Sequence, residues 1–182
     1  MSLEVKKYRT IVIDPPWPGP GATPAFDATV SGKMRLNLIP YSTMTGIQVA
    51  ALKVPEIADD AAQIFIWATS RSVADAFLLA QLWSFKYRAL FIWEKPGLGL
   101  GRHARTQADF LLWAGRCGAR LVASKDCPNQ IQRWPKPKRH SEKPSEAYDL
   151  IRRLSDGPRL DIFARQHREG FEPFGNQVPD GG

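Results

Sequence analysis

Short apolar runs rich in β-branched and aromatic residues alternate along the chain with segments of helical character. The runs predict five strands, over residues 8–13, 63–68, 87–94, 108–114 and 159–164. The intervening patterns predict three helices, over residues 45–52, 72–83 and 144–154, and either Ser42 or Thr45 can cap the first of them. Strands that alternate with helices indicate an α/β domain with a mostly parallel mixed sheet flanked by helices. Between residues 87 and 114 we expect two strands that are hairpin-like neighbours.

The length of 182 residues allows one sizeable core, so we predict a single domain over residues 1–182. No apolar run approaches the ~20 residues of a membrane span, and the first ten residues lack the apolar core of a signal peptide. We therefore expect a cytoplasmic location and no membrane partner. The two cysteines are not in Cys-x-x-Cys spacing and the three histidines are scattered, which predicts no metal site.

The formal charge of +7 favours a polyanionic partner, because Lys and Arg side chains that neutralise phosphates release condensed counterions. Residues 133–143 hold five Lys or Arg against one acid, with prolines that exclude a regular element and one interleaved tryptophan. Such a run is ordinarily a solvated surface. Its stiffness and aromatic residue favour a nucleic-acid groove here. The predicted contacts to nucleic acid are Arg133, Lys136, Lys138 and Arg139.

The first predicted strand ends at Asp14-Pro15-Pro16-Trp17, where ligands gather in open α/β sheets. An aromatic amine such as that of adenine is a poor nucleophile until both its hydrogens are held out of ring conjugation. The Asp14 carboxylate and a backbone carbonyl of the Pro15-Pro16 turn can accept them, and the prolines keep these acceptors aimed. Trp17 offers a face for base stacking, worth about 1–3 kcal/mol. The tetrapeptide therefore predicts a site that methylates an aromatic amine.

Further blocks follow in a characteristic order. They are Tyr41-Ser42-Thr43-Met44, Phe65-Ile66-Trp67-Ala68-Thr69, Trp93-Glu94-Lys95, a glycine-containing loop before Arg105, Arg139-His140-Ser141-Glu142-Lys143-Pro144, Asp161-Ile162-Phe163-Ala164-Arg165 and Gly175-Asn176-Gln177. With the tetrapeptide, they make the chain from Tyr8 to Val178 resemble the beta-class adenine methyltransferases that carry an Asp-Pro-Pro-Trp motif. This family includes the catalytic subunit of the eukaryotic mRNA adenosine methyltransferase and bacterial and phage relatives.

The resemblance implies a Rossmann-like domain that uses S-adenosylmethionine, with Asp14, Pro15, Pro16 and Trp17 as the catalytic motif. It implies that Lys143 lies against the methyl donor. The donor's ribose and adenine would be surrounded by Phe163, Arg165 and His167, and its ribose hydroxyls bound by Asn176 and Gln177. Two positions depart from the family pattern. Arg168 stands where some relatives carry a polar amide, and Asp109 replaces an expected glutamate and has no assigned role.

The resemblance predicts methyl transfer to the exocyclic N6 amine of adenine in nucleic acid. DNA is favoured over RNA because the compact chain resembles stand-alone bacterial or phage members. The alternatives are an RNA adenine methyltransferase, a catalytically inactive nucleic-acid-binding subunit and an enzyme that methylates cytosine. Asp14 and Lys143 argue against an inactive subunit, and Asp14 against cytosine, for which relatives carry Ser or Thr. No Gly-x-Gly-x-x-Gly fingerprint supports a nicotinamide or flavin enzyme. The sequence is compatible with a homo-oligomer but does not determine one.

Overall fold

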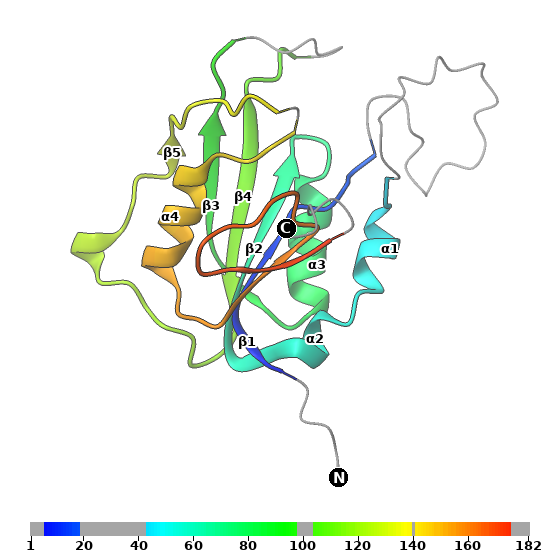
Figure 1. The fold of residues 1–182 in the computed structure, drawn as a ribbon, viewed down its shortest axis with the longest axis vertical. Helices are drawn as coiled ribbons and strands as arrows, with labels where there is room; N and C mark the ends of the chain where they lie inside the picture. The colour runs from blue at the N-terminus through cyan, green and yellow to red at the C-terminus, as the bar shows by residue number, and fades with distance from the viewer. Residues whose placement is uncertain (1–5, 19–42, 98–103, 140, 176–182) are drawn as a thin grey trace, which may run out of the picture.

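A computed structural model of the chain describes residues 6–18, 43–97, 104–139 and 141–175 (Figure 1). Its strands are β1 (Tyr8–Ile13), β2 (Ala58–Thr69), β3 (Lys86–Glu94), β4 (Ala108–Gly115), β5 (Ile131–Gln132), β6 (Arg159–Ile162) and β7 (Glu172–Phe174). Its helices are α1 (Gly46–Ala50), α2 (Val54–Ile57), α3 (Val73–Leu82) and α4 (Ser145–Leu154), with the 3₁₀ turn η1 at Ser124–Asp126. All five predicted strands and all three predicted helices are present.

In the described part of the chain the strands form one sheet in the order β5-β3-β4-β2-β1-β6-β7. The strand β4 is antiparallel to both of its neighbours, β2 and β3, and the other paired strands are parallel. The mostly parallel mixed sheet and the antiparallel neighbours between residues 87 and 114 are thereby confirmed. Because β4 runs in the opposite direction, its first residues lie at the edge where β1, β2, β3 and β6 end.

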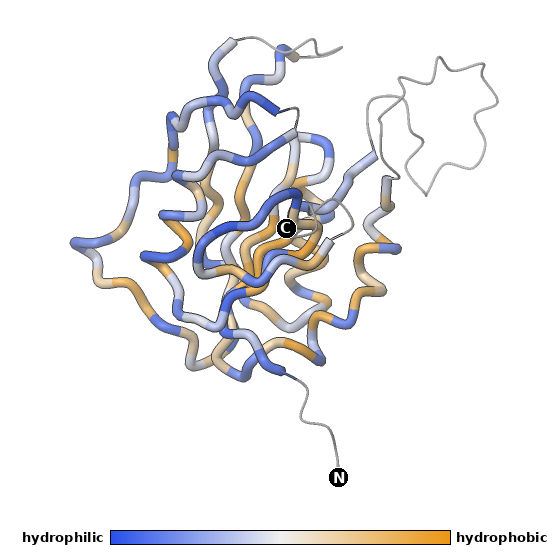
Figure 2. The backbone as a smooth tube through the Cα atoms, viewed as in Figure 1, coloured by the Kyte–Doolittle hydropathy of each residue, from blue (hydrophilic) through white to orange (hydrophobic). Residues whose placement is uncertain are grey.

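Helices cover both faces of the sheet. Successive residues of a strand point to opposite faces, so Ile11 and Ile13 join the core beneath α1, α2 and α3, whereas Val12 joins the core beneath α4. Strands buried on both faces read as continuous apolar runs in the sequence. Figure 2 shows apolar residues along the central strands and polar residues in the loops at the edge where the parallel strands end. The fold is the α/β, Rossmann-like arrangement expected from the sequence.

Four short elements, α2, η1, β5 and β7, were not predicted. The β7 segment Glu172–Phe174 has no alternating apolar pattern and pairs only with β6, at the edge of the sheet. An edge strand tolerates Pro173, which cannot donate a ladder hydrogen bond. The strand β2 begins at Ala58, five residues before its predicted start. The prediction missed this part of the strand because Asp59 and Asp60 are not apolar. These differences arise where pairing, not hydrophobicity, sets the boundary.

The helix starts agree with the sequence to within one or two residues. Thr45 caps α1 through a capping box, in which its hydroxyl accepts from the Gln48 backbone N–H and the Gln48 side chain accepts from the Thr45 N–H. Ser72 occupies the N-cap of α3, but its hydroxyl accepts from the Thr69 N–H instead. The alternative cap Ser42 lies outside the described residues. No helix in the described segments is long and apolar enough to cross a bilayer.

Candidate active site

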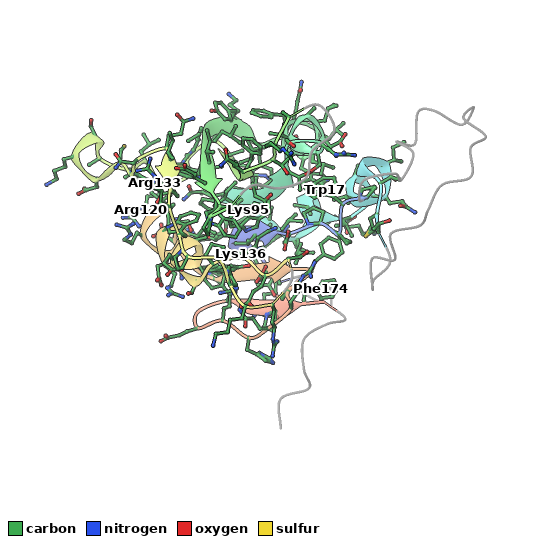
Figure 3. The ribbon with its side chains drawn as sticks, turned by 90° about the horizontal axis from the view of Figure 1, so that it is seen from above. Trp17, Lys95, Arg120, Arg133, Lys136 and Phe174 are labelled. Carbon is green, nitrogen blue, oxygen red and sulfur yellow. The ribbon has the colours of Figure 1, made fainter. Side chains whose placement is uncertain are left out.

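A cavity of about 670 Å³ lies at the sheet edge where β1, β2 and β3 end. Asp14, Pro15 and Trp17 line it directly after β1. Figure 3 looks onto this edge from above, with Trp17, Lys95 and Lys136 over the strand ends. The tetrapeptide therefore lies where the topology of an open α/β sheet concentrates ligand-binding groups.

The backbone and indole of the tetrapeptide are fixed by hydrogen bonds. Trp17 Nε1 donates to the Trp67 carbonyl oxygen at 2.8 Å, which holds the half-buried ring against the end of β2. The Trp17 N–H donates to the Pro15 carbonyl at 2.7 Å, and the Met44 N–H donates to the Pro16 carbonyl at 2.9 Å. Each carbonyl keeps a second lone pair. Pro15 is the better candidate for a substrate contact, because it lines the cavity.

Four charged side chains of alternating sign run across the cavity. Lys143 Nζ lies 3.3 Å from Asp14 Oδ1 and 3.6 Å from Asp109 Oδ2, and Lys95 Nζ lies 2.8 Å from Asp109 Oδ1. Lys143 and the two carboxylates are only 11–12% exposed, whereas Lys95 is 29% exposed. The Lys143 ammonium also lies 5.2 Å from the centroid of the Trp67 ring. The buried charges are thus mutually compensated.

Burial and the neighbouring charges shift the pKa values of this cluster. Burial raises the pKa of Asp14, and the Lys143 and Arg165 charges oppose that shift without cancelling it. Burial alone would lower the pKa of Lys143, but the Asp14 and Asp109 carboxylates outweigh it and the pKa is raised. The Lys143 ammonium therefore stays charged at neutral pH, next to a carboxylate that is easier to protonate than an ordinary aspartate.

A smaller cavity adjoins the first and shares Asp14, Glu142, Lys143 and Arg165 with it. Phe163 and Asp161 line it at the end of β6, where Phe163 has a positive φ of 65°. Asp161 is 2% exposed, and its Oδ1 has no hydrogen-bond partner in the described structure. Strained backbone and an unsatisfied buried acceptor both occur at ligand sites.

The pH dependence of stability tests the burial of Asp161. Burial raises the pKa of this carboxyl to about 7, although Tyr148 lowers it. The folded state then keeps a proton that the unfolded chain releases near pH ~4, so stability falls as pH rises from ~4 to about 7. We expect Asp161→Asn to raise the melting temperature relative to wild type more at pH 8 than at pH 5.

Differential scanning calorimetry at the two pH values measures this effect. Asp60→Asn, the same change at an exposed aspartate, is the matched control. A melting-temperature difference between Asp161→Asn and wild type that is the same at both pH values would contradict the expectation.

Gly175 follows β7 and approaches the chain after β6 closely. A Cβ at this position would lie 2.7 Å from the Ala164 carbonyl oxygen and 3.0 Å from the Ala164 nitrogen, which only glycine avoids. The Phe174 carbonyl accepts from the N–H groups of Phe163 and Ala164 at 2.7 and 3.3 Å. Gly175 thus lies against Phe163 and Ala164, which line the smaller cavity. The predicted donor ligands Asn176 and Gln177 come next and lie outside the described residues.

The basic segment divides into two parts. Lys136, Lys138 and Arg139 line the larger cavity, whereas Arg133 is not among its lining residues and donates from Nε to Glu94 Oε2 at 2.8 Å. In Figure 3 Arg133 lies on the side of Lys95 that is away from Trp17. The start of the segment is held on β3, because Trp93 Nε1 donates to the Trp134 carbonyl oxygen at 3.0 Å. Three of the four predicted nucleic-acid contacts therefore face the site of Asp14.

The structure brings most of the predicted residues together. Those that line the two cavities are Asp14, Pro15, Trp17, Lys136, Lys138, Arg139, Lys143, Phe163 and Arg165. Pro16 and the exposed His167 do not line either cavity. Arg168 has a structural role, because its guanidinium donates to the Lys143 carbonyl oxygen and lies 3.8 Å from the centroid of the Tyr148 ring. No three His, Cys, Asp or Glu side chains among the described residues are arranged to hold a metal ion.

The cavities also hold Lys95, Asp109 and Asp161, to which sequence reasoning assigned no role. A signal existed for Lys95, which directly follows a predicted strand, at the position where site residues gather. A signal also existed for Asp109, because the hairpin-like pairing expected between residues 87 and 114 brings the start of the second strand to the edge where the first one ends.

A comparison with protein families matches residues 8–177 to the MT-A70 family. The chain belongs to the MT-A70 family. It is 27% identical over 194 residues to the type II methyltransferase M.MunI of Mycoplasma sp, an alignment that covers 98% of this chain and 81% of that protein. It is 25% identical over 190 residues to the N(6)-adenosine-methyltransferase catalytic subunit METTL3 of Homo sapiens, covering 94% of this chain and 28% of that protein.

A similar match relates the chain to the N(6)-adenosine-methyltransferase MT-A70-like protein of Drosophila melanogaster. The two are 27% identical over 190 residues, which cover 94% of this chain and 27% of that protein. The chain therefore spans about a quarter of the length of these animal relatives and most of the length of the type II methyltransferase.

Proposed function

We propose that this MT-A70 chain transfers a methyl group from S-adenosylmethionine to the exocyclic amino nitrogen, N6, of adenine in a nucleic acid. The observation that carries the proposal is the buried Asp14 carboxylate, which lies beside Lys143 and Trp17 in a cavity rimmed by basic side chains. A carboxylate next to an aromatic face suits a flat base whose amino hydrogens must be held by acceptors.

The residues that the two cavities share, together with those at the end of β6, offer groups that suit S-adenosylmethionine. Asp161 offers an unsatisfied buried acceptor, which matches the ammonium and hydroxyl donors of this molecule, and Gly175 lets the chain pass close to Ala164, a residue of the cavity lining. We propose that it is held by Lys143, Phe163, Arg165, His167, Asn176 and Gln177. When bound, S-adenosylmethionine supplies an electrophilic methyl group on a sulfonium. The chain's own residues orient the two reactants and exclude water between them.

Donor binding is expected to weaken in Asn176→Ala and in Gly175→Ala. A lost hydrogen bond to a buried polar ligand costs roughly 1–3 kcal/mol. The Gly175 change acts indirectly, because the new Cβ would displace the chain from Ala164. Isothermal titration calorimetry with S-adenosylmethionine measures both variants. Gly46→Ala in α1 is the matched control, since its Cβ would meet only the side chain of Asp75. Wild-type affinity in both variants would contradict a donor site at this end of the chain.

The acceptor base is handled by the tetrapeptide. One amino hydrogen is accepted by the Asp14 carboxylate and the other by the Pro15 carbonyl, which turns the nitrogen lone pair out of the ring system. The Trp17 ring, held by its bond to the Trp67 carbonyl, stacks on the base. The rigid proline turn means that these acceptors are in place before the base arrives.

The charge of the cavity supports a nucleic acid as substrate. Its lining holds the basic residues Lys95, Lys136, Lys138, Arg139, Lys143 and Arg165 against the acidic residues Asp14, Asp109 and Glu142. An adenine in a duplex has its amino group in a base pair, so the substrate is a single strand or a base extruded from the stack.

DNA is the preferred acceptor in this proposal, ahead of RNA. The supporting observation is that the chain covers most of a type II methyltransferase but only about a quarter of the METTL3 relatives. The cytoplasmic location and a homo-oligomer stay predictions of the sequence.

Digestion of the product to nucleosides followed by mass spectrometry tests the function. The purified protein, S-adenosylmethionine and matched DNA and RNA oligonucleotides are expected to give N6-methyladenine in DNA. N6-methyladenine only in RNA would overturn the choice of DNA, and N4-methylcytosine would overturn the choice of base. Donor binding without any methylated nucleoside in a single-turnover assay would favour an inactive binding subunit.

A further inference from the structure

We propose that Asp109, clamped by Lys95, is a positioning residue that shares the Lys143 ammonium with Asp14 and so keeps Asp14 available to the acceptor amine. This inference rests on the proposed function, because it concerns how the acceptor carboxylate is kept ready. In this proposal neither Asp109 nor Lys95 contacts the reacting atoms.

Strand topology brings these residues together. Asp109 is the second residue of β4, which is antiparallel to β2 and β3, and it pairs with Thr69 and Trp93 near the ends of those strands. Lys95 directly follows β3, and its N–H donates to the Gln107 carbonyl at 2.6 Å. The pair is therefore built on sheet backbone, which gives it the rigidity that a positioning element needs.

The distances distinguish a fixed contact from a shared one. A charge-assisted N–H to carboxylate bond is typically about 2.7–2.9 Å long. Lys95 Nζ meets this value at 2.8 Å from Asp109 Oδ1, so the carboxylate is fixed. Lys143 Nζ lies 3.3 Å from Asp14 and 3.6 Å from Asp109, longer than this range on both sides. The ammonium thus lies between two carboxylates and forms a short ion pair with neither.

The sharing matters because Asp14 has two tasks. It compensates the Lys143 charge, and in the proposed reaction it also accepts an amino hydrogen. Without the Asp109 charge, the buried ammonium has one counter-ion left and is drawn closer to it, since Coulomb attraction is strong in a water-excluded site. The oxygen of Asp14 is then occupied by Lys143. Asp109 offsets this pull, and Lys95 keeps Asp109 from moving to Lys143.

The substitution Asp109→Asn preserves the side-chain shape and removes its charge. We expect kcat to fall on the order of 10²-fold, as for a small misplacement of a catalytic group, while the affinity for S-adenosylmethionine in calorimetry is retained. The conservative Asp109→Glu keeps the charge and should recover part of kcat. Lys95→Met releases Asp109 and should give a smaller loss. Asp126→Asn, an exposed carboxylate in η1, is the matched control.

A second measurement does not depend on activity. The Lys143 and Arg165 charges lower the pKa of Asp14 and the Asp109 charge raises it, and the buried Asp161 and Tyr148 also interact with the Asp14 charge. Asp109→Asn should therefore lower the pKa of Asp14, both by loss of a negative charge and by closer contact with Lys143. Carboxyl ¹³C NMR titration of the ligand-free protein measures this shift directly. The acid limb of the pH–rate profile should move to lower pH by the same amount, which a purely structural role would not produce.

The outcomes separate this proposal from the proposed function. A wild-type protein that forms no N6-methyladenine would overturn the function, and the titration would still decide whether Asp109 controls the Lys143–Asp14 contact. An Asp14 titration unchanged in Asp109→Asn would overturn the shared ammonium. Wild-type kcat in Asp109→Asn and in Lys95→Met would overturn the positioning role. If Asp109→Asn fails to fold, the smaller loss of kcat expected in Lys95→Met carries the kinetic test.

Discussion

Replacing Asp14 with asparagine is expected to lower methyl transfer on the order of 10²-fold or more, while S-adenosylmethionine still binds. The amide keeps the volume of the buried carboxylate but presents a donor where the substrate amine needs an acceptor. Losing one preorganised electrostatic group has a cost of this size in other active sites. Donor binding should survive, because Lys143 keeps Asp109 as a counter-ion, with its Nζ 3.6 Å from Asp109 Oδ2.

Single-turnover transfer of a labelled methyl group to an adenine-containing oligonucleotide measures this effect, with calorimetry for donor affinity. Asp126→Asn again serves as the control, because it makes the same Asp-to-Asn change at an exposed residue of the turn η1. Near-normal turnover in Asp14→Asn would contradict the proposal that the Asp14 carboxylate accepts a hydrogen of the substrate amine. Loss of donor affinity with intact single-turnover rates would instead assign Asp14 to the donor site.

The second large effect is expected from reversing three charges in the basic segment. Lys136, Lys138 and Arg139 are exposed and line the cavity, so their change to Glu should leave the fold intact. Nucleic-acid binding should weaken on the order of 10²-fold or more at low salt, since phosphates would face three like charges. The slope of log affinity against log salt concentration should flatten by about three, at ~0.9 per lost phosphate contact.

Fluorescence anisotropy with labelled DNA over a salt series measures both quantities. Lys53, Lys86 and Lys125 changed to Glu form the matched control, because these exposed lysines alter the net charge equally but lie outside the cavity. Equal weakening in the two triple variants would mean that net charge alone governs binding. A wild-type salt slope in the cavity variant would contradict phosphate contacts by this segment.

The sequence alone predicted the architecture well, because its strands are buried on both faces and therefore read as uninterrupted apolar runs. Residues 8–13 and 108–114 agree with β1 and β4 to within one residue. The Asp-Pro-Pro-Trp motif was recognised for a similar reason, since its chemistry and its place after a strand are both local. Strand pairing with a distant segment of backbone produces no local pattern in the sequence, which is why β7 was not predicted.

The assembled site required the tertiary structure. Lys143 reads as a solvated residue before a helix, and only the fold places its ammonium between Asp14 and Asp109. Asp109 reaches that position because β4 runs antiparallel to its neighbours, which brings its start to the edge where the parallel strands end. The sequence thus determined the strands, the helices and the motif, since these follow from local pattern. The order of the strands in the sheet and the packing of the segment before α4, both set by long-range contacts, decided which charges meet.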